Sequence, residues 1–208
     1  MLSFALSGVV QAATSNAENA IVFSQQFGEA RWTETLSQRI PETDPDYDRV
    51  ESVARRLAIA FASQYSDRTW TLRLIKTHEE PAATLPGNRI LVAKYAIDKW
   101  SDDALAFAIA HEMGHVQLDH YEARFRKLLT LANLDGARVT TWKDCMRYSA
   151  GIPNFKAQQE FDADKFGVRL ARSAGFDGFA GLREVLSTAP EDADHPPNAT
   201  RIERATAY

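Results

Sequence analysis

Apolar residues recur with helical spacing in one early stretch of the chain and alternate with polar residues in the next. The apolar positions between residues 50 and 61 fall on one stripe, which predicts an amphipathic helix with a buried face: Val50, Val53, Ala54, Leu57 and Phe61. Residues 70–75 alternate as in a strand, and a second apolar run at residues 90–93 follows the turn residues Pro86-Gly87. Residues 82–85, between these two runs, are expected to form an edge strand.

Two further stretches predict helices that carry polar side chains into the core. Ser101 is a candidate N-cap, and the apolar run of residues 104–110 predicts a helix that is buried on nearly every side. The apolar positions of residues 155–171 fit a second helix, which extends to about Ser173 and is stopped by Gly175. Several helices around a short sheet predict an α+β fold.

The chain of 208 residues is long enough for one good hydrophobic core, so a single domain over residues 31–208 is expected. Residues 14–30 are small and polar, which predicts a weakly ordered lead-in. Residues 1–30 are a candidate signal peptide or mobile lead-in, because residues 2–13 are mostly apolar and Val10-Gln11-Ala12 is a candidate cleavage site. A signal peptide predicts a periplasmic or secreted protein, and a mobile tail leaves a cytoplasmic location as the alternative.

Composition and charge exclude several classes of function. The formal net charge is -4 and the 24 Lys and Arg residues are scattered, so no footprint for nucleic acid is present. No run approaches the roughly 18 apolar residues that a membrane-spanning helix needs, and no transmembrane segment is expected. The sequence gives no indication of the oligomeric state.

The segment His111-Glu112-Met113-Gly114-His115 carries the chemistry, because it follows directly on the predicted buried helix. Residues four apart lie on one face of a helix, so the imidazoles of His111 and His115 can bind one ion. Glu112 is rotated by about 100° from His111, so it can reach a water held by the metal instead. The pattern predicts a hydrolytic zinc site; the alternative is two helix histidines hydrogen-bonded to neighbouring side chains.

A catalytic zinc site takes three protein ligands, and the predicted helix at residues 155–173 offers the best third one. Glu160 and Asp164 lie four apart on one face of that helix. Glu160 is expected to complete a His, His, Glu set, and Asp164 to accept the free imidazole N–H of a ligand histidine. A solvated acidic face paired with lysines is the alternative.

Two other residues with side chains that can bind metals, His120 and Cys145, are expected to play no part in the site. His120 is nine residues after His111, which places it on the opposite side of a continuous helix, pointing away from the metal. Cys145 is the single cysteine, and a lone thiol is more often a small buried apolar residue than a ligand.

Three separated motifs stand in a fixed order: His111 to His115, then Glu160-x-x-Ala163-Asp164, then His195-Pro196-x-x-x-x-Arg201-Ile202. In that order and spacing they resemble the gluzincin metallopeptidase family of HtpX and the CAAX-prenyl endopeptidases, and most closely its small soluble bacterial members. The resemblance covers roughly residues 46 to 206. It implies a mostly helical zincin fold, with a small sheet whose edge strand borders the zinc cleft.

The resemblance implies a zinc endopeptidase with one Zn²⁺ per chain and a protein or peptide as substrate. In this reaction Glu112 is the general base that takes a proton from the water and later passes it to the leaving amine. His195 is expected to donate to the oxyanion or to bind zinc as an inhibitory fourth ligand, a plain helix start being the alternative. Arg201 is expected to pair with Asp164 or else to be exposed.

A substrate peptide is expected to add as a strand to the edge at residues 82–85, a mode that leaves sequence specificity weak. Such an enzyme suits unfolded or misassembled proteins, by analogy with the family. Residues 135–155 are expected to form an inserted helix or loop over the cleft. Two other functions stay open: an HExxH regulatory protease of toxin-antitoxin type, and a non-enzymatic zinc-stabilised scaffold or chaperone-like binding module.

Overall fold

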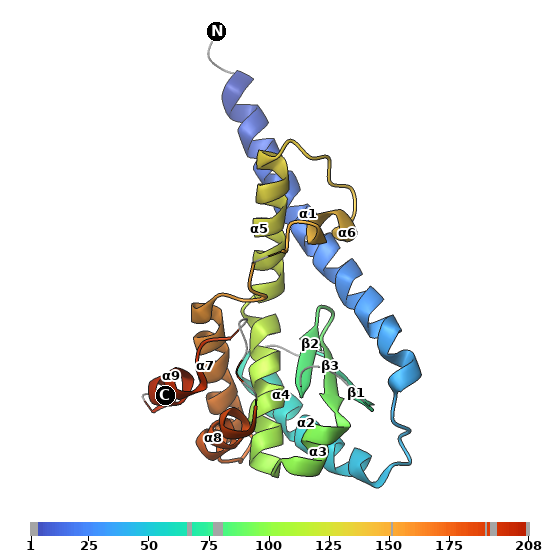
Figure 1. Cartoon of the computed structure of the whole chain (residues 1–208), viewed down its shortest axis with the longest axis vertical. Coiled ribbons are helices and arrows are strands. Elements are labelled where there is room, and N and C mark those ends of the chain that lie inside the picture. The colour runs from blue at the N-terminus through green and yellow to red at the C-terminus, as the bar shows by residue number, and fades with distance from the viewer. Residues whose placement is uncertain are drawn as a thin grey trace.

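A computed structural model describes residues 4–65, 68–76, 81–150, 152–189, 191 and 195–206, with side chains described from Asn16 onward. Figure 1 shows its elements in chain order. The helices are α1 (Phe4–Glu34), the 3-10 turn η1 (Thr35–Gln38), α2 (Pro45–Gln64), α3 (Lys94–Lys99), α4 (Asp102–Gln117), α5 (His120–Leu134), α6 (Trp142–Met146), α7 (Ala157–Ser173), α8 (Gly178–Thr188) and α9 (Asn198–Ala205). The strands are β1 (Thr71–Ile75), β2 (Ala82–Leu85) and β3 (Arg89–Ala93).

The sheet has the strand order β1-β3-β2, so β2 is an edge strand. β1 runs parallel to β3 with Leu72 opposite Ile90, and β2 runs antiparallel to β3 with Thr84 opposite Ile90. The tight turn from β2 to β3 places Gly87 at φ 90° and Asn88 at φ 57°, in the left-handed region that Gly and Asn tolerate. The mostly helical α+β fold with a small sheet is confirmed.

α4 is the central helix of the fold and packs against β2, α2, α7 and α8 (Figure 1). Ser101 caps it, because its side-chain oxygen accepts a hydrogen bond from the N–H of Ala104. Every residue from Ala104 to Ala110 is buried, as the unbroken apolar run predicts. The segment His111 to His115 therefore continues inside the protein rather than on its surface.

The expectation of a weakly ordered lead-in at residues 14–30 is wrong, since this segment belongs to the long helix α1. Its apolar residues recur at helical spacing: Ala20 and Phe23 are buried against Phe125 of α5, and Phe27 packs beside them. Small and polar residues surround this short apolar stripe in the sequence, so its helical spacing is difficult to recognise. The candidate cleavage site at residues 10–12 lies where side chains are not described, and cleavage of a signal peptide stays a prediction.

α1 also packs against the hairpin of β2 and β3. A Cβ atom at Gly28 would lie 2.3 Å from the carbonyl oxygen of Pro86, so only glycine allows this contact. One position on, Glu29 forms an ion pair with Arg89 of β3. Within the described residues, no helix has both the length and the apolar character needed to cross a membrane.

Two glycines allow α4 and α7 to approach each other closely. Gly114 lies against Phe166, where an added Cβ would be 3.1 Å from the ring. Gly167 lies against His111, where an added Cβ would be 2.9 Å from the backbone nitrogen and 3.0 Å from the Cα. Because backbone atoms cannot swing aside as a side chain can, Gly167 fixes the distance between the helix of His111 and the helix of Glu160.

We expect the substitution Gly167→Ala to push α7 away from His111 and to lower the free energy of unfolding by about 1–3 kcal/mol. Urea unfolding of the metal-free protein measures this change. The control Lys165→Ala, at an exposed position of the same helix, should change it by less than about 0.5 kcal/mol. Equal stability of the two variants would show that the helices are not in close contact here.

Candidate metal centre

Three helices and one loop bring the predicted site residues into a single, mostly buried cluster, called here the His-Glu cluster. It comprises His111, Glu112 and His115 from α4, Glu160 and Asp164 from α7, His195 from the loop before α9, and Arg201 from α9. His111, Glu112 and His115 offer possible ligand atoms that all lie within 4.8 Å of one another.

The ring nitrogens of the two helix histidines face the carboxylate of Glu160. The Nε2 atoms of His111 and His115 are 3.1 Å apart, and they lie 3.4 Å and 3.6 Å from the nearer oxygens of Glu160. Three ligands of a tetrahedral zinc ion lie about 3.3 Å from one another, because Zn–N and Zn–O distances are about 2.0–2.1 Å. The three side chains thus have the spacing of a zinc site.

Burial and charge show that these residues fit a divalent cation. Glu160 is 1% exposed, and within the described structure neither of its oxygens has a hydrogen-bond partner. A buried carboxylate of this kind is costly unless a cation lies beside it. The carboxylates of Glu112, Glu160 and Asp164 together with the guanidinium of Arg201 leave two negative charges, which one divalent ion neutralises.

Asp164 ties the cluster to α9. Its two oxygens accept hydrogen bonds from Nε and NH2 of Arg201 at 2.9 Å and 2.6 Å, and Oδ1 lies 3.0 Å from Nδ1 of His111. Burial would raise the pKa of Asp164, but the hydrogen bonds from Arg201 and His111 outweigh it and hold that pKa below its ordinary value. Asp164 is therefore an anion that orients the His111 ring with Nε2 toward Glu160.

The two carboxylates around His111 favour positive charge between them. Burial lowers the pKa of His111, but the neighbouring carboxylates of Asp164 and Glu160 raise it to about 10. Burial would raise the pKa of Glu160, but the nearby His111 brings it below its ordinary value. A site that attracts a proton this strongly has the electrostatic character of a cation site.

Glu112 points from α4 to the edge of the sheet. Its Oε2 accepts two hydrogen bonds from Thr84 of β2, from the backbone N–H at 2.8 Å and from the hydroxyl at 2.9 Å. The carboxylate thus lies between the two histidines and the edge strand, where a bound polypeptide would pass. Tyr121 donates from its hydroxyl to the carbonyl oxygen of the same Thr84.

Comparison with known families supports a peptidase. The profile of peptidase family M48 matches residues 46–208. The chain belongs to peptidase family M48. This confirms the resemblance to the gluzincins of HtpX and the CAAX proteases, and membership of this family makes the protein a metallopeptidase. A comparison with curated proteins found no match.

His195 of this M48 protein reaches the cluster from the loop before α9. Its Nε2 is 3.9 Å from Oε2 of Glu160, and its side chain is 31% exposed. The ring is therefore close to the ligand set and also open to the outside. This position is compatible with an oxyanion donor and with a fourth ligand, so both interpretations of His195 stand.

The expectation that His120 points away from the metal is wrong. The helix of His111 ends at Gln117, and Asp119 adopts φ 54°, so the chain turns before α5 begins at His120. The reversal brings Nδ1 of His120 within 2.9 Å of Nδ1 of His115. No glycine or proline marks the break in the sequence, and an aspartate in the left-handed conformation is hard to foresee.

Two cavities flank the His-Glu cluster of the M48 protein. One of about 120 Å³ is lined by His111, Glu112, His195 and Arg201 and has an apolar wall that includes Trp100, Phe107, Val185 and Leu186. The other, of about 820 Å³, runs along β2 past Glu112 and His115 to α1 and the segment before α7, with Phe27, Trp142, Met146 and Phe155 in its wall. The cluster therefore opens to both sides, and the segment at residues 135–155 borders the larger cavity.

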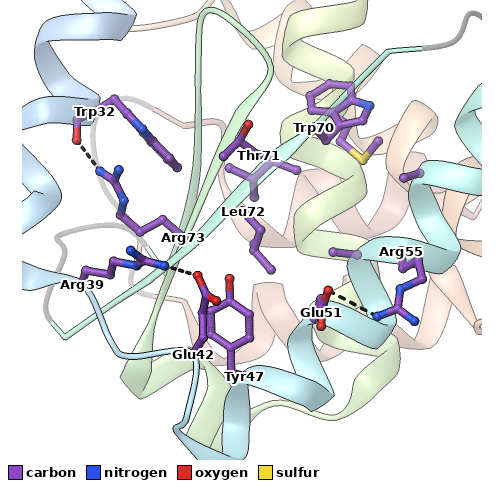
Figure 2. Close-up of a pocket in the computed structure, with 14 residues that line it drawn as sticks. Trp32, Arg39, Glu42, Tyr47, Glu51, Arg55, Trp70, Thr71, Leu72 and Arg73 are labelled. Atoms are coloured by element: carbon purple, nitrogen blue, oxygen red, sulfur yellow. Dashed lines mark hydrogen bonds and ion pairs between the residues drawn. The ribbon is translucent and has the colours of Figure 1, made fainter.

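A third cavity, of about 530 Å³, lies at the opposite edge of the sheet along β1 (Figure 2). Figure 2 shows that charged side chains of its wall pair with each other: Arg39 with Glu42, and Arg55 with Glu51. Arg73 donates to the backbone oxygen of Trp32 and stacks on its ring. This cavity contains no residue of the His-Glu cluster, and we do not place the active site there.

We expect Arg201→Met to destabilise the protein by about 3–5 kcal/mol, because it leaves the buried carboxylate of Asp164 without its cation. Chemical unfolding of the metal-free protein measures the loss. Arg204→Met is the matched control, since Arg204 is an exposed residue of the same helix that stacks on Phe161, and it should cost about 1 kcal/mol or less. Similar stability of both variants would contradict a buried pair.

Proposed function

We propose that this M48 protein is a zinc-dependent endopeptidase in which His111, His115 and Glu160 hold the metal. One observation carries the proposal: Nε2 of His111 and Nε2 of His115 lie 3.1 Å apart, and each faces an oxygen of the buried Glu160, at 3.4 Å and 3.6 Å, close to the edge length of a tetrahedral zinc site. A catalytic site leaves the fourth position open, and the two flanking cavities give a substrate access to it.

Zinc at this position would supply Lewis acidity, which acidifies a water and polarises the scissile carbonyl. Glu112 takes a proton from the attacking water on its carboxylate and delivers it to the nitrogen of the leaving amine. The hydroxyl and backbone N–H of Thr84 hold one oxygen of this carboxylate and so fix its orientation. Asp164 keeps the proton of His111 on Nδ1, so that Nε2 remains available as a ligand atom.

The substrate strand is proposed to add to the outer edge of β2. Tyr121 and Glu112 now hold the backbone groups of Thr84 that a paired strand would need. A substrate strand must therefore displace Tyr121 from the carbonyl oxygen of Thr84 and share the N–H of Thr84 with Glu112. Backbone pairing reads no sequence, and the apolar wall of the smaller cavity favours an apolar side chain next to the cut bond. These features suit unfolded or misassembled proteins, whose chains are extended and expose apolar residues.

We expect Glu112→Gln to retain one zinc ion per chain and to lower kcat by about 10²–10⁴-fold, because it removes the proton acceptor but none of the three ligands. Elemental analysis and casein cleavage measure the two quantities. Glu203→Gln, at an exposed position of α9, should leave both unchanged. Undiminished cleavage by Glu112→Gln would exclude Glu112 as the base.

The companion variant His111→Ala separates the enzyme from a non-enzymatic zinc-stabilised binding module. Both functions require metal, but only the enzyme cleaves casein in the unaltered protein and loses this activity together with zinc. An unaltered protein that holds zinc and cuts no polypeptide would favour the binding module. The match to family M48 weighs against the toxin-antitoxin type of regulatory protease.

His195→Ala distinguishes the two roles of His195. If His195 stabilises the oxyanion, kcat should fall by about 10²–10³-fold with zinc coordination unchanged. If it is an inhibitory fourth ligand, kcat should rise and X-ray absorption should show one nitrogen fewer around zinc. Unchanged turnover with unchanged coordination would remove both roles.

A periplasmic or secreted location stays a prediction that fractionation of expressing cells can test.

A further inference from the structure

We propose that His120 is a positioning residue for His115: its Nδ1 accepts a hydrogen bond from Nδ1–H of His115 and so holds Nε2 of His115 toward the metal. This inference rests on the proposed zinc site and adds a residue that the sequence motifs do not contain. It concerns how the ligand is oriented and not the reacting atoms.

The two ligand histidines have the same arrangement, each with one partner behind it. Nδ1 of His111 lies 3.0 Å from Asp164, and Nδ1 of His115 lies 2.9 Å from His120. In both rings the opposite nitrogen, Nε2, faces Glu160. A histidine that binds a metal through one nitrogen normally gives the proton on the other to a second group, which fixes both tautomer and ring orientation.

The fold holds His120 in this position from several sides. His120 is 5% exposed and opens α5 directly after the left-handed residue Asp119. Phe155 stacks on the His115 ring with 4.1 Å between centroids and also contacts the ring of His120 at 5.8 Å. Phe155 thus restrains the ring of His115 by stacking and also packs against the ring of His120.

Metal binding by His115 determines which ring nitrogen of His115 and of His120 carries a proton. When Nε2 of His115 binds a metal, its proton is on Nδ1, and His120 must offer an unprotonated Nδ1 with its own proton on Nε2. A neutral acceptor here adds no charge to a cluster whose carboxylates and Arg201 already balance a divalent ion. His111 thus has an anionic partner and His115 a neutral one.

The test compares His120→Leu with His120→Asn. Leucine fills the space and cannot accept a hydrogen bond, whereas the amide oxygen of asparagine can lie near the position of the lost Nδ1. We expect His120→Leu to raise the zinc dissociation constant by about 10–100-fold, measured by competition with a chelator, and His120→Asn to restore most of the affinity. Thermal unfolding of the metal-free proteins reports any general loss of stability.

Cobalt(II) substitution gives a second measurement that does not depend on activity. The visible absorption bands of cobalt report the geometry of its ligands, so they should shift in His120→Leu and return toward those of the unaltered protein in His120→Asn. Equal zinc affinity and equal spectra in the unaltered protein and His120→Leu would overturn the role of His120, as would equal weakening by both substitutions. An unaltered protein that binds no zinc would instead overturn the zinc site itself.

Discussion

Negative charge in the interior is the constraint on which the rest of this structure depends. Glu160 and Asp164 are 1% and 0% exposed, the partly buried Glu112 lies beside His111 and His115, and Arg201 pairs with Asp164. Removing carboxylates from water costs several kcal/mol each unless cations replace the lost hydration. Arg201 compensates one of the three negative charges. A divalent ion held by His111, His115 and Glu160, as proposed, would compensate the other two.

The packing around the charges serves to place them. Gly114 and Gly167 bring α4 and α7 close enough for Glu160 to face the two histidines. The edge strand β2 holds Glu112 through Thr84, so the sheet positions the proposed general base and also offers the edge proposed for the substrate strand. α1 precedes the segment that matches family M48 and still forms one wall of the larger cavity, so part of the cleft wall comes from outside the matched segment.

Much of the local structure could be predicted from the sequence, because single helices and strands follow from periodicity and caps. The stripe at residues 50–61, the cap at Ser101 and the edge strand at residues 82–85 all lie where the pattern puts them. Glu160 was expected opposite the histidines from helix geometry together with the number of ligands zinc requires. Tertiary features carry weaker local signals. The local sequence does not indicate that the chain turns at Asp119 and brings His120 toward His115. It also does not indicate that α5 packs on the short apolar stripe of α1.

The most direct test of the account is anomalous diffraction at the zinc absorption edge from crystals of the zinc-loaded protein. The account predicts one strong peak about 2.0–2.2 Å from Nε2 of His111, Nε2 of His115 and a carboxylate oxygen of Glu160. A peak at any other place, or a Glu160 carboxylate turned away beyond coordination distance, would contradict it.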